Sequence, residues 1–456
     1  MYQDQHASFS VGQHTQPACA VAPLRVGMIG LGTVGAGTYR VLQRNAGVIA
    51  ARTGRRIEIR MVAVRHLARA AGIVTPEVRL TDDPFAVVND PGIDVVVEVM
   101  GGTGLARELV LQAISQSKHV VTANKALLAE HGSEIFAAAQ AQGVVVAYEG
   151  AVAVSIPIIK ALREGLAANH IQWVAGIING TTNYILSEMQ AKGLGFAAAL
   201  AEAQRLGYAE ADPALDVQGL DAAHKLTLLA ANAFGVPVRF DQVYVEGITT
   251  LDALDIRLAG RLGYCVKLLG IARRTPHGLE LRVHPTLIAA DHLLAQVHGA
   301  MNAVLVKSDA AGITMYYGAG AGAEPTASAV IADLVDVCRV AGTAPRQRVP
   351  HLAFQPDAIQ ALPVAAIDAL ESRYYLRLDV VNPARTVAQL LGHLAVAGVS
   401  VQQLDVTEHP GDPGWSAVVL LTDPTPERVL RGVLAELAQW PSVMGFASTL
   451  RMEALN

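Results

Sequence analysis

The amino-acid sequence predicts an α/β fold that begins with a doubly wound parallel sheet. Two observations support this prediction. Short apolar segments rich in β-branched residues alternate with helical patterns through the first third of the 456-residue chain, and this alternation is typical of a parallel sheet covered by helices on both faces. The segment Gly30–Gly35 also has the spacing G-x-G-x-x-G, directly after the first apolar segment.

Five strands and two helices are expected in this first part of the chain. The strands are residues 25–29, 57–64, 94–99, 119–122 and 144–148, and the helices are residues 34–48 and 106–116. Strands of four to eight residues separated by helices indicate a Rossmann-type sheet. We expect a dinucleotide-binding domain over residues 23–150, preceded by a disordered polar tail, residues 1–22, without the pattern of a signal peptide.

Two further domains are expected after residue 150. Residues 151–345 predict an α+β domain, and a proline-rich linker is expected at residues 346–372. The α+β domain combines helices at 154–166, 197–206, 221–233 and 327–340 with strands at 171–178, 265–272 and 279–285. Residues 373–456 have the order βαββα, with elements at 374–380, 386–397, 401–406, 417–421 and 426–438. This order predicts a small separate module.

The composition argues against several classes of protein. The formal net charge is −5 and no run of Lys or Arg stands out, which argues against a nucleic-acid partner. A membrane-spanning helix needs about 20 apolar residues, and the most apolar stretch, residues 144–159, is interrupted by an acid, a glycine and a proline. The widely spaced Cys19, Cys265 and Cys338 fit neither a disulfide framework nor a zinc site and suit the cytoplasm.

The glycine motif predicts a dinucleotide site. Gly30, Gly32 and Gly35 permit a tight turn and close approach of a pyrophosphate, and Thr33 and Val34 complete the turn. The N-terminus of the following helix supplies free N–H groups and partial positive charge. A glycine turn that serves only close packing is the alternative.

The ends of the later strands add further cofactor contacts. The second strand ends at Arg65 without an acid to bind the ribose 2′-hydroxyl of NAD. Arg65 could meet a 2′-phosphate, which favours NADP and leaves NAD open; a solvated strand-end residue is the alternative. Lys125 follows the fourth strand, at the edge of the sheet where ligands bind, although an isolated lysine is more often a surface residue. Thr103 is also expected to contact the cofactor.

Residues 207–225 contain the densest chemical signal, with four carboxylates and a lysine close together. Asp221 and Lys225 are four residues apart and would share a helix face. The next residues, 226–234, are strongly apolar, and a charged pair at the start of a buried helix is costly unless it is satisfied. Such a lysine could protonate an alkoxide as hydride arrives, and Glu210 could bind an ammonium group. A solvated loop with a surface ion pair is the alternative.

The same segment resembles the signature of homoserine dehydrogenases. The matching residues are Ala203, Gly207, Tyr208, Asp212, Pro213, Asp216, Gly219, Asp221 and Lys225. Residues 122–125, 179–186 and 320–329 also resemble that family, and the resemblance extends from about Leu24 to the C-terminus. It implies NAD(P)H-dependent interconversion of L-aspartate 4-semialdehyde and L-homoserine, in the biosynthesis of threonine, methionine and isoleucine.

The resemblance also implies roles for individual residues. Lys225 would donate the proton to the new alcohol, with support from Asp221. Glu210 and Asp216, with Lys225, would bind the amino-acid end of the substrate. Lys125 would lie between the nicotinamide and the substrate. Residues 151–345 would then form the substrate-binding and dimerisation domain.

Gly322 and a cation site follow from the same resemblance. Gly322 would line the cofactor cleft, because segment 318–340 would return to the first domain. A monovalent cation, sodium, would bind mainly to backbone carbonyls after the fifth strand. The expected cation ligands are Glu149, Val152, Val154 and Ile156. This chain has Val154-Ser155 where many members have two glycines, a departure that bears on this site.

The C-terminal module resembles an ACT-type regulatory domain, which implies a threonine effector. The family's glycine in the first turn is replaced by Ala384 in this chain, so a module that only supports oligomerisation is the alternative. A homodimer or homotetramer is expected. Two rival functions are a non-catalytic amino-acid sensor and a dehydrogenase for another semialdehyde. An aspartate-semialdehyde dehydrogenase would need a cysteine nucleophile, and none of the three cysteines has a suitable context.

Overall fold

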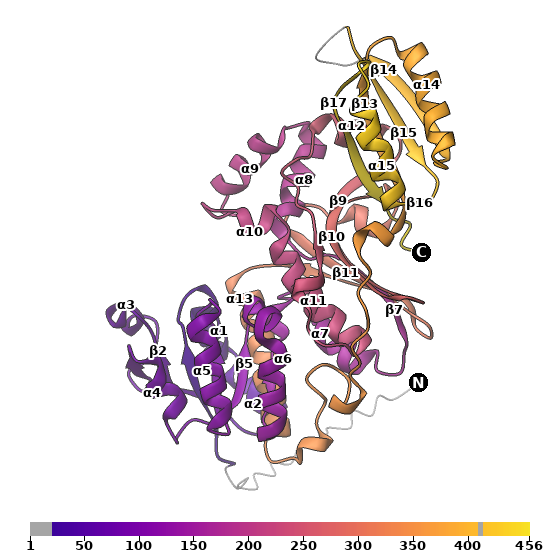
Figure 1. Ribbon diagram of the computed structural model, residues 1–456. Helices are drawn as coiled ribbons and strands as arrows, with labels where there is room; N and C mark the ends of the chain where they lie inside the picture. Colours follow the sequence, from indigo (N-terminus) through magenta and orange to yellow (C-terminus); the bar gives the residue numbers. More distant parts are fainter. Residues whose placement is uncertain (1–20, 409–413) are drawn as a thin grey trace, which may run out of the picture.

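The computed structural model describes residues 21–408 and 414–456, and Figure 1 shows how its parts are arranged. The expected tail at residues 1–22 lies almost wholly outside the described residues. Two sheets organise the described chain, one of six strands and one of eleven. The six-stranded sheet lies at one end of the molecule and the C-terminal strands lie at the other, with the helix-covered part of the larger sheet between them.

The first sheet is parallel throughout and has the order β3-β2-β1-β4-β5-β6. Its strands are β1 Leu24–Ile29, β2 Ile57–Ala63, β3 Arg79–Thr81, β4 Val95–Glu98, β5 His119–Thr122 and β6 Val146–Ala147. This order is that of dinucleotide-binding folds, and it confirms the predicted doubly wound sheet. The short, partly exposed β3 was not predicted from the sequence.

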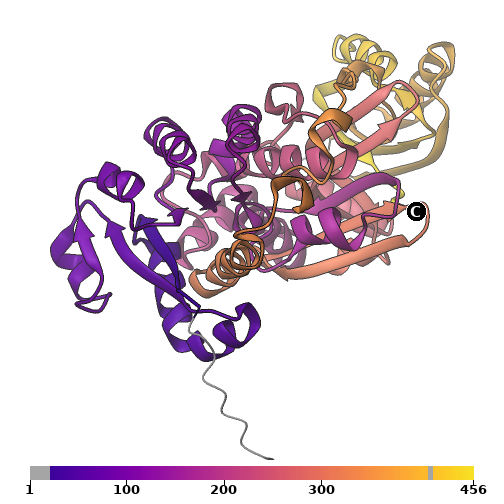
Figure 2. The same ribbon diagram turned by 90° about the horizontal axis from the view of Figure 1, so that it is seen from below.

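Helices cover both faces of this sheet, as Figure 2 shows from below. They are α1 Thr33–Arg44, α2 Ala46–Thr53, α3 Leu67–Ala71, α4 Pro84–Asn89, α5 Gly104–Ser115 and α6 Lys125–Gln142. The helix expected at 34–48 is interrupted at Asn45, whose backbone leaves the helical region at φ −106° and ψ 15°. The break divides it into α1 and α2.

The central part of the chain forms half of the larger sheet and most of the remaining helices. Its strands are β7 Ile171–Ile177, β8 Tyr244–Val245, β9 Tyr264–Thr275, β10 Gly278–Ala289, β11 Met301–Ser308 and β12 Gly312–Ala319. Its helices are α7 Ile158–Lys160, α8 Gly180–Lys192, α9 Phe196–Arg205, α10 Ala214–Val217, α11 Leu220–Phe234, α12 Ala253–Arg261 and α13 Ala323–Val340. The helix expected at 154–166 begins only at Ile158, because Val154 has a positive φ of 55°.

Helix α13 returns to the first sheet after β12. Its apolar residues Val330, Leu334 and Val337 are buried in the same cluster as residues of β1 and α1. The contact is close, because a Cβ at Gly37 in α1 would lie 2.6 Å from the Ala323 carbonyl oxygen. No helix in the described residues is long and apolar enough to span a membrane.

The C-terminal module contains two strands beyond the predicted βαββα order, the two-residue β16 and the full-length β17. Its elements are β13 Glu371–Val380, α14 Pro383–Val396, β14 Val401–Glu408, β15 Ser416–Thr422, β16 Thr425–Pro426, α15 Glu427–Leu437 and β17 Val443–Met452. The strand order β17-β13-β15-β14 is antiparallel and is that of a ferredoxin-like βαββαβ unit. β17 also pairs in parallel with β10, so the module and the central part share one sheet.

The segment expected to be a linker packs against the central part of the chain. Leu352 is buried in the main core, the His351 carbonyl accepts a 2.7 Å hydrogen bond from Tyr148, and Val364 forms a β-bridge with Leu279. Short 3₁₀ turns replace regular structure here. Apolar contacts therefore hold this segment in place.

Candidate active site

One carboxylate joins two lysines from different parts of the chain. Asp221 lies in the first turn of α11, and its Oδ2 is 2.7 Å from Lys225 Nζ one helical turn later. Its Oδ1 is 3.0 Å from Nζ of Lys125, the first residue of α6. The predicted shared face of Asp221 and Lys225 is confirmed, and Lys125 joins them.

The positions of these charges at helix ends explain why they need one another. An anion near a helix N-terminus is favourable, whereas a cation there opposes the helix dipole. Asp221 at the start of α11 is thus stabilised, and Lys125 at the start of α6 is stabilised by Asp221 instead. Gly219 has φ +84°, a left-handed conformation that favours glycine, and this turn leads directly into Asp221.

Asn179 completes the charged group, although the sequence had predicted no role for it. Its Nδ2 donates hydrogen bonds to Asp216 Oδ1 at 2.7 Å and to Asp221 Oδ2 at 2.8 Å. Its Oδ1 accepts from the Thr182 backbone N–H at 2.8 Å and so caps α8. An asparagine before Gly-Thr-Thr, after a strand, is a helix-cap pattern that could have drawn attention to it.

The protonation states of the three ionisable groups are coupled. Burial alone would raise the pKa of Asp221, but the Lys225 and Lys125 ammonium groups hold it well below its usual range. The attraction of Asp221 raises the pKa of Lys125 in spite of burial. Burial lowers the pKa of Lys225, and Asp221 offsets only part of that effect. A lysine with a lowered pKa gives up its proton more readily.

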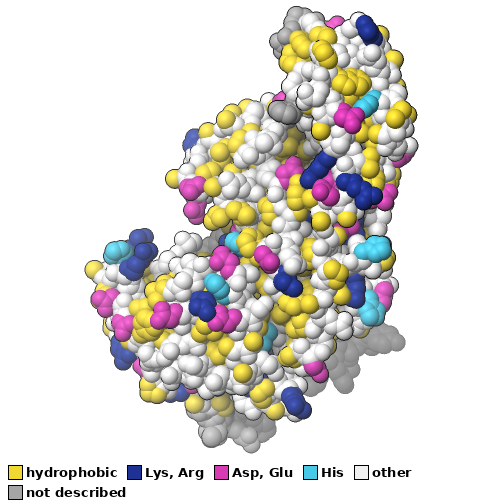
Figure 3. All heavy atoms as spheres, in the orientation of Figure 1, with side chains coloured by type: hydrophobic (Ala, Val, Ile, Leu, Met, Phe, Trp, Pro, Cys, Tyr) yellow, Lys and Arg dark blue, Asp and Glu magenta, His cyan; other side chains and the backbone are white. Residues whose placement is uncertain are grey.

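A cleft of about 450 Å³ opens beside this group, between the carboxyl ends of the β-strands and α10–α11. It is lined by Val34, Gly101, Gly102, Asn124, Lys125, Glu210, Asp216, Asp221 and His224, among others. In the space-filling view, acidic and histidine side chains gather where the first sheet meets the helices beyond it (Figure 3). Ligands of doubly wound sheets bind in this kind of crevice.

The predicted site residues differ in how they face this cleft. The Lys125 side chain is 38% exposed and lines the cleft. Lys225 is buried beside Asp221, and its Nζ also donates to the Ile178 carbonyl at 2.7 Å. Glu210 is exposed at the cleft, and its carboxylate forms no ion pair within residues 21–408 and 414–456. The cleft therefore offers an ammonium group and carboxylates at once.

The buried Glu98 and the cleft-lining Asn124 hold the loop at residues 100–102, on the side of the cleft nearest the first sheet. Glu98, at the end of β4, accepts hydrogen bonds from the backbone N–H groups of Met100 and Gly101 at 2.9 and 3.2 Å. Its other oxygen accepts from Thr122 at 2.7 Å. The Asn124 side chain donates to the Gly102 carbonyl at 2.7 Å. These bonds fix the loop opposite Lys125, and the sequence had not predicted them.

The glycine motif fits a bound dinucleotide. A Cβ at Gly35 would lie 2.2 Å from the Gly30 carbonyl oxygen, so a side chain is excluded there. A Cβ at Gly32 would meet nothing within 4 Å, which leaves open space in front of α1. No side chain caps the N-terminus of α1, so its N–H groups, next to Thr33 and Val34, can bind a pyrophosphate.

The other predicted cofactor residues each lie beside the end of a strand or a helix. Arg65 follows β2, is exposed, and forms no ion pair within the described part of the chain. Thr103 precedes α5, and its side chain does not cap that helix. Gly322 has φ +128° and directly precedes α13. The return of α13 to α1 carries Gly322 to the first domain.

The loop of the predicted cation ligands has an irregular backbone. The Glu149 side chain is buried and accepts from the Ile159 and Lys160 N–H groups at 2.9 Å each. Among the described residues, no hydrogen bond reaches the carbonyl oxygen of Val152 or Val154. The Ile156 carbonyl accepts from Ile158. Carbonyls free of partners are able to bind a cation.

A dinucleotide-binding sheet whose cleft holds a lysine–carboxylate–lysine group defines a nicotinamide-dependent oxidoreductase. Family models agree with this class. Residues 30–149 match the model described as homoserine dehydrogenase, NAD binding domain, and residues 157–335 match the model described as homoserine dehydrogenase. The chain belongs to the homoserine dehydrogenase family.

Full-length relatives extend this assignment. The chain is 54% identical to a homoserine dehydrogenase of Pseudomonas aeruginosa over 95% of this chain and 100% of the relative. It is 50% identical to one of Neisseria gonorrhoeae over 95% of this chain and 99% of the relative. The crystal structure of a homoserine dehydrogenase from Thiobacillus denitrificans is similar, with a TM-score of 0.91 and 54% identity over 95% of this chain and 99% of that chain.

Proposed function

We propose that the chain interconverts L-aspartate 4-semialdehyde and L-homoserine in the cleft beside Asp221, with NADPH preferred over NADH. The observation that carries this proposal is the bridge from Asp221 to Lys125 and Lys225, at 3.0 and 2.7 Å, beside the dinucleotide fold. The two lysines of this bridge are proton donors close to the place where a reduced nicotinamide would bind. The absence of an acid after β2 and the unpaired charge of Arg65 among the described residues support the NADP preference.

Each residue of the cleft has a proposed task. Glu210 and Asp216 bind the ammonium group of the substrate, because opposite charges attract strongly at a partly buried site. Lys125 orients the aldehyde oxygen, and Lys225 supplies the proton to the oxygen as it becomes an alcohol. Asp221 holds both lysines in place. A bound reduced nicotinamide would supply the hydride.

The remaining proposed contacts hold the cofactor. Gly30, Gly32 and Gly35, with Thr33 and Val34, receive the pyrophosphate at the N-terminus of α1. Arg65 binds the 2′-phosphate. Thr103 and Gly322 are the further proposed contacts, from just before the start of α5 and of α13 respectively.

A monovalent cation, Na⁺, is proposed at the loop after β6. Its ligands would be the carbonyl oxygens of Glu149, Val152, Val154 and Ile156. The partner-free carbonyls of Val152 and Val154 among the described residues support this proposal, as does the unusual φ of 55° at Val154. A cation there would hold the loop between the dinucleotide domain and the substrate domain.

The proposed C-terminal module, residues 373–456, is of the ACT type. Its βαββαβ order supports this proposal, and threonine is the proposed effector. We further propose a homodimer or homotetramer in the cytoplasm. Light scattering of the purified protein, with and without threonine, would measure the assembly.

A spectrophotometric assay tests the central proposal. Purified protein would be given homoserine with NADP or NAD at alkaline pH, with and without threonine, and the rise in absorbance at the nicotinamide band followed. Turnover with a preference for NADP is expected. Turnover with another semialdehyde and none with homoserine would contradict the proposal. Folded protein that binds NADPH but turns over neither would favour a sensor.

A further inference from the structure

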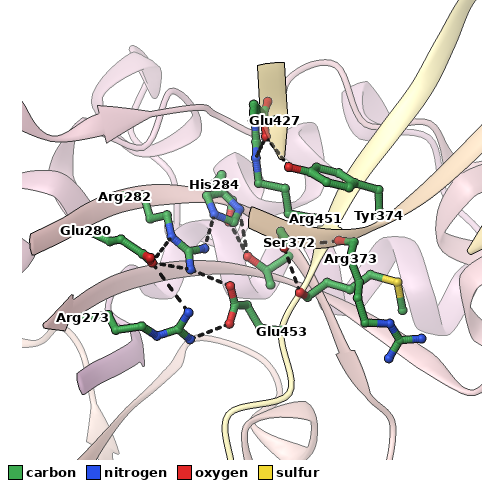
Figure 4. Close-up of polar contacts among 12 residues, drawn as sticks. Arg273, Glu280, Arg282, His284, Ser372, Arg373, Tyr374, Glu427, Arg451 and Glu453 are labelled. Atoms are coloured by element: carbon green, nitrogen blue, oxygen red, sulfur yellow. Dashed lines mark hydrogen bonds and ion pairs between the residues drawn. The ribbon is translucent and has the colours of Figure 1, made fainter. Parts of the chain in front are cut away.

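Arg451, on the last strand β17, ties the C-terminal module together. Its side chain is 8% exposed, and its Nε and Nη2 lie 3.0 and 2.7 Å from the two carboxylate oxygens of Glu427 in α15. Tyr374 donates to the same carboxylate at 2.7 Å. Figure 4 shows Arg451 and Tyr374 both directed at Glu427.

The same guanidinium also reaches the central part of the chain. Arg451 Nη1 is 2.7 Å from Glu246 Oε2, and its Nη2 donates to the Tyr244 hydroxyl at 3.3 Å. That hydroxyl donates to Glu246 Oε2 at 3.0 Å, and the guanidinium lies 5.1 Å from the centroid of the Tyr244 ring. Arg451 therefore fixes β8 and Glu246 from the side of the C-terminal module.

The residues just after β8 pack directly on the turn between α10 and α11. The Ile248 N–H donates to the Val217 carbonyl at 2.8 Å, and a Cβ at Gly247 would lie 2.3 Å from that carbonyl oxygen. A Cβ at Gly219 would lie 3.2 Å from Val245 Cγ1. At Gly247 and Ile248, backbone thus contacts the backbone of Val217 directly, with no side chain between them to absorb a displacement.

That turn carries the carboxylates of the cleft. Asp216 lies at the end of α10 and Asp221 at the start of α11, and both accept a hydrogen bond from Asn179. A shift of residues 245–248 would move both carboxylates relative to Lys125, which belongs to another domain. Misplacement of such groups by about 1 Å can reduce rates by about 100-fold.

We propose that the Glu246–Arg451 ion pair is a positioning device for the substrate site, by which the C-terminal strand holds Asp216 and Asp221 in register with Lys125. Arg451 and Glu246 do not line the cleft and act through residues 245–248. The inference rests on the proposed function, in which Asp216 binds the substrate and Asp221 holds the two lysines. In this proposal, strand β17 helps to position the residues of the active site.

Glu246→Gln tests this proposal, with Asp252→Asn as a matched control. Glu246 and Asp252 have side chains that are 35% and 52% exposed, and each pairs with a buried arginine of the C-terminal module, Arg451 or Arg377. Asn at position 252 also keeps the helix cap that Asp252 gives α12. Only Glu246 adjoins the α10–α11 turn.

We expect Glu246→Gln to raise KM for aspartate semialdehyde about tenfold through Asp216 and to lower kcat to a smaller extent through Asp221, together within the roughly 100-fold loss that a misplacement of such groups by about 1 Å causes, with an unchanged Kd for NADPH. Asp252→Asn should leave all three unchanged. Arg451→Lys, which retains one charged contact, should give an intermediate KM. Unchanged kinetics in Glu246→Gln, or equal effects in the control, would overturn the proposal.

Amide hydrogen exchange gives a second measurement that does not need turnover. Exchange of the Ile248 amide, which is bonded to Val217, should become faster in Glu246→Gln and stay unchanged in Asp252→Asn. Equal exchange in the wild type and Glu246→Gln would overturn the positioning role. If the wild-type protein did not turn over homoserine, the proposed function would be refuted. The exchange result would still test the contact between residues 245–248 and the α10–α11 turn.

Discussion

At the scale of single residues, the site depends on one carboxylate that serves two cations. Asp221 satisfies the buried Lys225 with one oxygen and the cleft-facing Lys125 with the other. A buried charge without a partner costs several kcal/mol, so the ammonium group of the buried Lys225 depends on Asp221, which also raises the pKa of the partly exposed Lys125. The protonation of the cleft is thus set by three side chains together.

Lys225→Ala should reduce kcat by about 100- to 10,000-fold, the usual contribution of a general acid. NADPH binding should survive, because Lys225 lies away from the glycine motif in the sheet domain. Steady-state kinetics and fluorescence titration with NADPH would measure the two effects. Lys192→Ala, a change at an exposed lysine of α8, should retain wild-type turnover. Normal kcat in Lys225→Ala would remove the proton-donor assignment.

Arg65→Asp should weaken NADPH binding far more than NADH binding, because the new carboxylate repels a 2′-phosphate and can accept a hydrogen bond from a 2′-hydroxyl. The ratio of the two Kd values is the measurement. Arg52→Asp makes the same charge change at an exposed position of α2 and should leave that ratio unaltered. Equal weakening of both cofactors by Arg65→Asp would show that Arg65 does not recognise the 2′-phosphate.

At the scale of secondary-structure elements, two histidines hold the segment around β6. The Val145 N–H donates to Nδ1 of His119 at 3.0 Å, so that nitrogen must be unprotonated. Burial lowers the pKa of His119 to about 4. Burial also lowers the pKa of His351, which stacks on Phe136, to about 4. Both rings are therefore neutral in the folded protein at physiological pH.

Stability should fall on acidification below pH 6.5. Each folded pKa of about 4 lies below the ordinary value of 6.5, so the stabilising effect is complete above pH 6.5 and is lost as the pH falls toward 4. Each histidine contributes at most about 3 kcal/mol by this linkage. Urea unfolding at pH 7.5 and pH 5 would measure the loss. His119→Gln, which does not titrate, should have a flatter pH profile; an unchanged profile would contradict this explanation.

The elements that the sequence predicted well are those whose pattern is local. Apolar runs identified β1, β2, β4 and β5, and the glycine spacing identified the start of α1. Strand β17 was missed because it contains Gly445, Ser448 and Thr449, and because a register shift opposite Arg377–Asp379 interrupts its pairing. Strands β11 and β12 were also missed.

In the site, too, the residues that could be predicted are those with a local sequence pattern. The acidic cluster and Lys225 lie within one short segment, so their spacing indicated them. Asn179 was assigned no role because its two carboxylate partners are 37 and 42 residues away along the chain. The loop-fixing role of Glu98 depends likewise on Thr122, 24 residues later. Contacts of this kind are set by the packing of helices on strands and carry no local pattern.

At the scale of the whole molecule, buried ion pairs join the C-terminal strand to the central part of the chain. Arg282, with a side chain 2% exposed, lies between Glu280 at 3.1 Å and Glu453 at 2.5 Å. Arg273 also contacts Glu453, at 2.7 Å. This network lies beside the pairing of β17 with β10 (Figure 4). The two parts should therefore unfold together.

Glu453→Ala should lower the free energy of unfolding by about 3–5 kcal/mol, because it leaves the buried Arg282 short of a partner. Urea unfolding followed by circular dichroism and by tryptophan fluorescence should give one coincident transition. Glu436→Ala removes an exposed carboxylate, 66% accessible, from its pairing with His393 and should cost no more than about 1 kcal/mol. Two separate transitions in the wild type would contradict the expectation that the C-terminal module and the central part of the chain unfold together.

The position of β17 has a consequence for biosynthesis of the chain. This strand, Val443–Met452, lies between β10 and β13 in the sheet, although β10 ends at Ala289. β8, made earlier, pairs with β10 at Arg282 and Val283, but on the ribosome Thr286 and Leu287 must wait for more than a hundred further residues before β17 pairs with them. The dinucleotide domain can fold early during translation. This end of β10 meanwhile offers unpaired backbone groups to other nascent chains, so slow translation or early termination favours aggregation there.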